Sequence, residues 1–244
     1  MSDVYVDSEL IFKAGATNKV NIIGNPNPER MTSVDWFDQT AINLTNDYTS
    51  TLGGANDAVA LTAGGTNGVT LTTGTGDNEV SFLAGGLIFD ITQEPEIESK
   101  VEMTDVSGTF AYFGFSDAVL EATPIATIDG AGGTHEAGAT DAVGFVIDAD
   151  FETSSIYLVS VKTGGAVQAV DTGLAYADGE AKRLKVALDS SGNARGYVDG
   201  IQVAYIASAV ADVALCAIYN YGTRAADGSN TVIARHLKKW QNEA

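Results

Sequence analysis

The acidic side chains are the residues of this chain best suited to catalysis or metal binding, and three of them alternate along one segment. Glu94, Glu96 and Glu98 occupy every second position, so on a β-strand they would point to the same side. Two neighbouring carboxylates are what glycoside hydrolysis requires. Pro95 interrupts the segment, however, and Lys100 continues its charged side. We therefore expect a solvated outer face of a strand, and we predict no catalytic residue and no enzymatic activity.

Two further acidic clusters are spaced like parts of a calcium-binding loop. They are Asp148, Asp150 and Glu152, and Asp227, Ser229 and Asn230. Calcium takes six or more oxygen ligands from a defined loop or from several segments, and neither cluster has EF-hand spacing. We interpret both as acidic turns and predict no metal site and no cofactor, although the acidic chain would attract weakly bound cations.

Histidine, cysteine and glycine form no pattern typical of a cofactor site. His135 and His236 have no second histidine or cysteine at metal-ligand spacing, which argues against zinc. Cys216, the only cysteine, lies in an apolar run and is predicted to be a small buried side chain. No phosphate-binding fingerprint is present. Four glycines are interpreted as turn residues: Gly114, Gly130, Gly132 and Gly133.

The only two tryptophans, Trp36 and Trp240, lie near the two ends of the main domain. We predict that Trp36 anchors the core and that Trp240 packs at the rim. Stacking on a sugar ring is the alternative for either side chain.

Composition and charge exclude several classes of partner. The 244 residues include 13 Lys and Arg against 32 Asp and Glu, which gives a net charge of −19. Nucleic acids and anionic membranes bind through cationic side chains, so neither is an expected partner. The start of the chain has neither the basic residues nor the apolar run of a signal peptide. We expect a soluble protein made in a cytoplasm.

The rest of the chain reads as short strands separated by turns that contain Gly, Asn and Asp, a pattern that indicates an all-β sandwich. A helix over Ser208–Ala217 is the one alternative, and the β-branched and aromatic continuation favours a strand. The predicted strands are Ala58–Leu61, Val69–Thr72, Glu79–Phe82, Gly86–Ile91, Glu96–Met103, Thr109–Phe115, Ala142–Ile147, Ser155–Val161, Ala166–Val170, Arg183–Leu188, Gln202–Ile206, Val213–Tyr221 and Thr231–Leu237.

Residues 1–34 differ from the sandwich domain predicted over residues 35–244. Polar residues and Gly separate two short β-like pieces, Val4–Val6 and Val20–Ile23, and Asn25-Pro-Asn-Pro28 ends the segment. We interpret residues 1–34 as an extended N-terminal arm that lies on the domain or on a neighbouring subunit; a frayed terminus is the alternative. The apolar side chains favour an arm exchanged between copies, and thus a homo-oligomer. They are Ile11, Phe12, Ile22 and Ile23.

The segment from Leu184 to Tyr205 is predicted to be a three-stranded meander. Leu184, Val186 and Leu188 alternate inward, residues 189–193 form a turn, and Asp199-Gly200 has the preference of a type I′ hairpin turn. This segment resembles the concanavalin A-like (LamG-like jelly-roll) superfamily. The segments Glu96–Asp117, Asp141–Asp150 and Thr231–Trp240 are similar to strands of jelly-roll proteins that recur among tailed-bacteriophage virion components.

The resemblance implies a jelly-roll β-sandwich of two antiparallel sheets, and its motifs describe the fold more than the chemistry. We expect a non-enzymatic structural virion protein: a capsid decoration (cement) protein made in the host cytoplasm and located on the capsid surface. Its expected partners are the major capsid protein and copies of itself. The alternative is a carbohydrate-binding module of a tail fibre or a cell-surface adhesin, with a glycan as partner.

Overall fold

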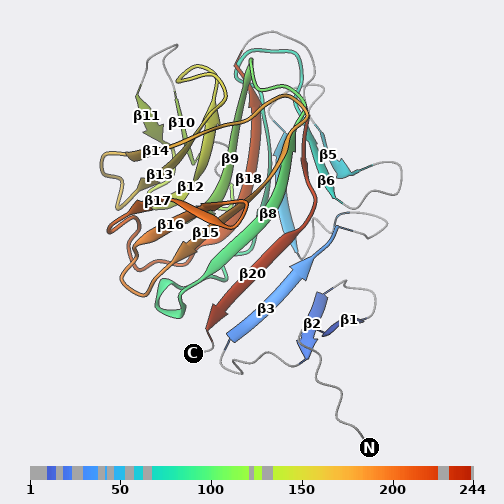
Figure 1. The fold of residues 1–244 in the computed structure, drawn as a ribbon, viewed down its shortest axis with the longest axis vertical. Helices are drawn as coiled ribbons and strands as arrows, with labels where there is room; N and C mark the ends of the chain where they lie inside the picture. The colour runs from blue at the N-terminus through green and yellow to red at the C-terminus, as the bar shows by residue number, and fades with distance from the viewer. Residues whose placement is uncertain are drawn as a thin grey trace, which may run out of the picture.

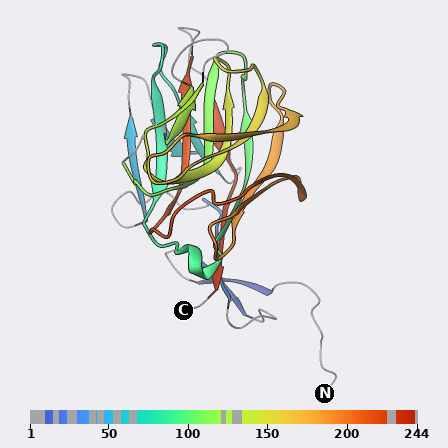
Figure 2. The ribbon, with the colours of Figure 1, turned by 90° about the vertical axis from the view of Figure 1, so that its left-hand side faces the viewer.

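A computed structural model describes residues 10–14, 19–23, 30–37, 42, 47–52, 58–62, 68–120, 124–127, 134–224 and 231–242. Within these ranges the chain is built from β-strands, most of which form two stacked antiparallel sheets (Figures 1 and 2). A 3₁₀ helix, η2, spans Ile91–Gln93 at the lower end of the sandwich (Figure 2). None of the described segments forms a helix long and apolar enough to cross a membrane.

The first sheet has seven strands in the order β14-β13-β12-β9-β18-β7-β4. Every residue of β9, β12 and β18 is buried, because these central strands are covered on both faces. This explains why their sequences read as continuous apolar runs rather than as alternating ones. The strands are β4 (Tyr48–Leu52), β7 (Val80–Gly85), β9 (Thr109–Ser116), β12 (Ala142–Asp148), β13 (Ser155–Val161), β14 (Gln168–Ala175) and β18 (Cys216–Thr223).

The second sheet has nine strands and one solvated face. Its main path runs β17-β16-β15-β8-β19-β6-β5, and β20 joins β8 to β3. Burial alternates along β8 with period two, as expected for a strand with one wet face. The strands are β3 (Arg30–Asp35), β5 (Ala58–Leu61), β6 (Val69–Thr72), β8 (Glu96–Met103), β15 (Ala181–Leu188), β16 (Ala194–Val198), β17 (Ile201–Ile206), β19 (Thr231–Ala234) and β20 (Leu237–Asn242).

The nine-stranded sheet branches beside β8. β19 pairs with the end of β8, at Val101–Met103, while β20 pairs with its start, at residues 96–98. Between them the chain leaves the ladder, and the backbone N–H of Arg235 donates to the carbonyl of Lys100 (2.9 Å). The single strand predicted over Thr231–Leu237 is therefore wrong. On its other edge β19 pairs with β6, whereas β20 pairs with β3.

Two short strand pairs lie outside both sheets. β1 (Leu10–Ala14) pairs with β2 (Lys19–Ile23) beside β3, to its right in Figure 1. β10 (Ile125–Thr127) pairs with β11 (His135–Ala137). The last residues of the predicted arm lie in β3, which is part of the nine-stranded sheet. The division into residues 1–34 and 35–244 stays a prediction.

The main core lies between the two sheets. It combines large side chains of the seven-stranded sheet with aliphatic side chains of the nine-stranded one; Phe113, Phe145 and Tyr219 pack with Leu71 and Val186 in a single cluster. The sequence pattern that predicted a jelly-roll sandwich of two antiparallel sheets is therefore confirmed.

The meander is also confirmed, as β15, β16 and β17. Its second turn has positive φ at both Asp199 (51°) and Gly200 (84°), which a type I′ turn requires. The predicted strand Gly86–Ile91 is wrong. Only Phe89 makes an isolated bridge, to Leu215, and Asp90 then caps η2 by accepting a hydrogen bond from the N–H of Thr92 (2.8 Å).

Several other strand limits differ from the predicted ones. The strand predicted from Val213 begins at Cys216, and the strand predicted over Ala166–Val170 spans Gln168–Ala175. Five strands were not predicted, namely β1, β3, β4, β10 and β11, and the predicted piece Val4–Val6 lies outside the described residues. All five are edge or accessory strands, and most have few consecutive apolar residues, so their hydrophobic signal is weak.

Candidate functional site

The glutamates of β8 lie on the outer face of the nine-stranded sheet, where cations surround them. Glu98 is 3.0 Å from Lys238 Nζ, 3.8 Å from His236 Nε2 and 3.9 Å from Arg183 Nε. Burial raises the pKa of Glu98, but the nearby His236 and Lys238 side chains and the positive charge of Arg183 outweigh it and lower that pKa to about 2. Glu98 is therefore ionised at neutral pH.

The neighbouring glutamates have partners of their own. Glu96 binds Lys185 Nζ at 2.5 Å, and Glu102 binds Arg235 Nη2 at 2.5 Å. Glu94 does not share their face, because it precedes β8 and has a left-handed backbone (φ 51°). The expectation that all three predicted glutamates alternate along one strand is correct for Glu96 and Glu98 and wrong for Glu94. The charged outer face that the sequence predicts is present, and it is a lattice of ion pairs.

The opposite outer face of the molecule, on the seven-stranded sheet, is apolar and closed. Side chains from β7, β9, β12, β13 and β18 form a second hydrophobic cluster there. Ile125 and Ala139, from the segment between β9 and β12, pack onto it and are buried themselves. The largest members from the sheet have at most 1% of their surface exposed: Phe82, Phe110, Tyr112 and Ile218.

Tyr112 fills the centre of this closed face because two glycines leave room for its ring. Gly114 and Gly144 face each other across β9 and β12. A Cβ on Gly144 would lie 2.7 Å from the ring of Tyr112, and one on Gly114 would lie 2.9 Å from its hydroxyl. That hydroxyl donates to the carbonyl of Phe115 (2.7 Å). Gly114 is thus a packing glycine within a strand, and its interpretation as a turn residue is wrong.

The acidic cluster at Asp148 is a buried ion pair at one end of the sandwich. Arg224 donates to both carboxylate oxygens of Asp148, from Nε at 2.9 Å and Nη2 at 2.7 Å. Its Nη1 donates to Asn78 Oδ1 at 2.7 Å, and its Cζ lies 4.9 Å from the ring centre of Phe110. The side chains of Asp148 and Arg224 are only 0% and 7% exposed.

The other members of that cluster are also engaged. Asp150 lies 3.8 Å from Arg224, and Glu152 accepts a hydrogen bond from the hydroxyl of Tyr157. The residues that the structure describes contain no group of three or more His, Cys, Asp or Glu placed to hold a metal ion. Asp227, Ser229 and Asn230 lie outside the described residues, as do Gly130, Gly132 and Gly133.

Histidine and cysteine occupy packed positions. The ring of His135 stacks on Phe151 with centroids 4.2 Å apart. Burial lowers the pKa of His135, and this effect exceeds that of the negative charge of Asp148, which raises it. Cys216 is fully buried in the closed face, as the sequence predicts, and burial raises the pKa of its thiol to about 12.

The tryptophans do not hold the core together. Trp36 is only partly buried and contacts His236 with ring centroids 5.4 Å apart, so its predicted role as a core anchor is wrong; its neighbour Phe37 is buried instead. Trp240 lies on the charged outer face. Lys185 Nζ is 5.4 Å from its ring centre and 5.1 Å from that of Tyr197.

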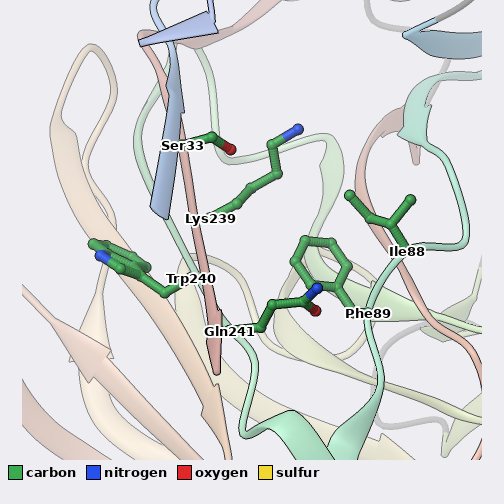
Figure 3. A pocket seen from close by; sticks show the side chains of 6 residues that line it. All are labelled: Ser33, Ile88, Phe89, Lys239, Trp240 and Gln241. Carbon is green, nitrogen blue, oxygen red and sulfur yellow. The ribbon is translucent and has the colours of Figure 1, made fainter. Parts of the chain in front are cut away.

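A small pocket lies behind Trp240, on the other side of β20. Figure 3 shows Lys239, Gln241 and Phe89 toward this pocket and the indole of Trp240 on the opposite side of the strand. Ser33, Ile88 and part of Trp240 complete its lining. Ile88 is 53% exposed, so the pocket is shallow. Most of its lining surface is apolar.

Comparisons with known proteins support the fold alone. No protein-family model matches the chain, and no curated protein matches it in sequence. A protein of unknown function from Shewanella oneidensis MR-1 is similar in structure, with a TM-score of 0.60, 14% identity, and coverage of 88% of this chain and 87% of that one.

Other similar structures have a stated function. The catalytic domain of a laminarinase from Thermotoga petrophila has a TM-score of 0.60 and 10% identity, over 86% of this chain and 97% of its own. The carbohydrate recognition domain of Emp47p has a TM-score of 0.58 and 12% identity, over 87% and 95%. The chain therefore shares its jelly-roll sandwich fold with a laminarinase catalytic domain and with a carbohydrate recognition domain.

Proposed function

We propose that the chain is a non-enzymatic structural protein, specifically a decoration protein on the capsid surface of a tailed bacteriophage. In this proposal it binds the major capsid protein and neighbouring copies of itself. The observation that carries the non-enzymatic part is the closed face of the seven-stranded sheet. Tyr112, Phe82 and Phe110 fill that face with apolar surface, and Ile125 covers it, so the sheet serves as a packed scaffold.

The carboxylates support the same proposal. A glycosidase needs one carboxyl group that can donate a proton and a second that stays ionised. Here the pKa of Glu98 is lowered to about 2, Glu96 pairs with Lys185 at 2.5 Å, and Asp148 is bound by Arg224. These carboxylates have the environment of structural ion pairs. The assignment to a virion rests on the resemblance of the strand segments to jelly-roll proteins of tailed phages.

Electron microscopy of purified virions tests the proposal. Particles of the phage whose genome encodes this chain should carry protruding density on the shell, and particles made without the gene should lack that density and bind the added protein. Finding the protein in infected cells but absent from purified particles would overturn the proposal. Turnover of laminarin or another β-glucan by the purified protein would overturn its non-enzymatic part.

A carbohydrate-binding module is the second candidate function. It is favoured by Trp240 and Tyr197, whose rings lie on an outer face, and by the likeness of the fold to a carbohydrate recognition domain. A glycan array tests it: this candidate predicts binding by the native protein that Trp240→Ala abolishes. If no glycan is bound, or if Trp240→Ala leaves binding unchanged, this candidate is excluded.

A further inference from the structure

The outer face of the nine-stranded sheet gathers cations in a chain that has few of them. Strand alternation places them there: Arg183 and Lys185 on β15 point to the same side as Lys100 on β8, with which Arg183 is paired in register. Six of the 13 Lys and Arg lie on or beside this face: Lys100, Arg183, Lys185, Arg195, Arg235 and Lys238. Four carboxylates lie among these cations, namely Glu96, Glu98, Glu102 and Asp189. Six cations against four carboxylates give this face a small excess of positive charge, whereas the chain as a whole has a net charge of −19.

Aromatic side chains are interleaved with these cations on the three adjacent strands β15, β16 and β17. Tyr205 on β17 is paired with Arg195 on β16, and the guanidinium carbon of Arg195 lies 5.6 Å from its ring centre. Tyr197 is paired in the same way with Lys185, which also contacts Trp240. Tyr205 is 45% exposed and the Arg183 side chain 54% exposed, so the face offers both to a partner.

Carboxylates on the same face hold its cationic and aromatic side chains in a fixed arrangement. Glu96 fixes Lys185 between two rings, and Asp189 Oδ2 lies 3.4 Å from Arg195 Nη1. Side chains that are ordered before binding lose less conformational entropy when a partner docks. Trp, Tyr and Arg are also the residue types that dominate binding energy in protein–protein interfaces.

We propose that this face, defined by Trp240, Tyr197, Tyr205, Arg183 and Arg195, docks an acidic protein surface, namely the shell to which the decoration protein attaches. The inference rests on the proposed function and adds the orientation and the chemistry of attachment. Charge complementarity selects the partner: the strongly acidic remainder of the chain repels an acidic surface, whereas this face has a small excess of positive charge and presents the exposed cations Lys100 and Arg183. At physiological salt, charges more than about 8 Å apart are largely screened from each other. The acidic remainder of the chain therefore has little effect on a partner that is bound at this face, and the charges of the face itself determine the interaction.

Co-sedimentation with phage particles assembled without the protein tests the inference. We compare the native chain, the double variant Arg183→Gln/Arg195→Gln, the variant Tyr205→Ala, and the control double variant Lys162→Gln/Lys182→Gln, which removes the same charge outside the face, since Lys182 alternates to the opposite side of β15 from Arg183. Circular dichroism and the unfolding midpoint of each variant establish that it is folded. The two face variants should bind at least about 30-fold more weakly than the native chain. The control should bind as the native chain does, and added NaCl should weaken native binding.

The outcomes separate the two proposals. If the native chain does not bind the particles, the proposed function fails. If the native chain binds and the folded face variants bind equally well, the docking face is wrong and the decoration function stands. Retention of the native chain on polygalacturonate, lost in the face variants and without binding to particles, would instead identify the face as a site for an acidic glycan and overturn the inference.

Discussion

Replacing Arg224 with methionine removes the cation from the buried ion pair at the end of the sandwich. The change deletes two charge-assisted hydrogen bonds to Asp148, at 2.9 and 2.7 Å, and one to Asn78, at 2.7 Å. It also deletes the contact with the ring of Phe110. The Asp148 carboxylate, with no exposed side-chain surface, then loses its counter-ion and keeps only hydrogen bonds such as the one from the N–H of Asp150 (3.1 Å).

Removing one partner of a buried pair costs about 3–5 kcal/mol, mostly from the charge left without compensation. We therefore expect Arg224→Met to lower the free energy of unfolding by about that amount, a large part of the about 5–15 kcal/mol typical of a domain. Replacing both residues, Asp148→Asn with Arg224→Met, should cost less than Arg224→Met alone, since no buried charge then remains.

Urea unfolding of the native chain, both single variants and the double variant measures this as a double-mutant cycle. The native chain and the double variant should lie closer together than the native chain and Arg224→Met. A loss below about 1 kcal/mol for Arg224→Met, or strictly additive losses in the double variant, would refute the view that this pair acts as one buried unit.

Further predictions concern the closed face and the charged face. Cys216 should not react with a thiol reagent in the native protein, whereas Ile125→Asp should open the cover and make it reactive; rapid modification of the native thiol would show that the face is open. Glu98 has a folded-state pKa of about 2, below its usual 4.5, so its stabilisation is present above pH 4.5 and is lost as the pH falls toward 2. The Glu98→Gln variant should therefore be less stable than the native chain at pH 6 and equal to it near pH 2, and an equal deficit at both pH values would contradict the ion-pair assignment. Gly144→Ala should destabilise the protein by about 1–3 kcal/mol through overpacking, because the new Cβ would meet a backbone oxygen at 2.6 Å. Gly86→Ala is the control, since a Cβ there meets nothing nearer than 3.6 Å. Equal stability of the two alanine variants would contradict the packing of Gly144.

Local sequence patterns were sufficient to predict the sandwich and much of its charged face. The alternation of Glu96, Ile97 and Glu98 requires a strand with one wet side, and Asp199-Gly200 requires a tight turn. The paired partners of these glutamates come from β15 and β20, far away in the sequence. The outward positions Lys185 and Tyr197 were visible in the meander, as residues alternating with its apolar ones, but their proximity to Trp240 depends on strand order.

The closed face was harder to predict for the same reason. Gly114 gives no local sign that it lies opposite Gly144 and close to the ring of Tyr112.

The ion pair of Arg224 and the position of Trp36 were not predicted either. Arg224 joins the ends of β12 and β18, which both pair with β9 but lie far apart in the sequence. Trp36 was misplaced because its size suggested burial, whereas the following residue, Phe37, occupies the core.

The copy number of this protein in purified virions tests the central claim most directly. Under the proposed function, quantitative mass spectrometry of particles from the encoding phage measures it relative to the major capsid protein. A decoration protein should be present in a number of copies comparable to that of the major capsid protein, and treatment that strips the capsid surface should release it. A few copies per particle that remain with the tail, or none at all, would contradict the account.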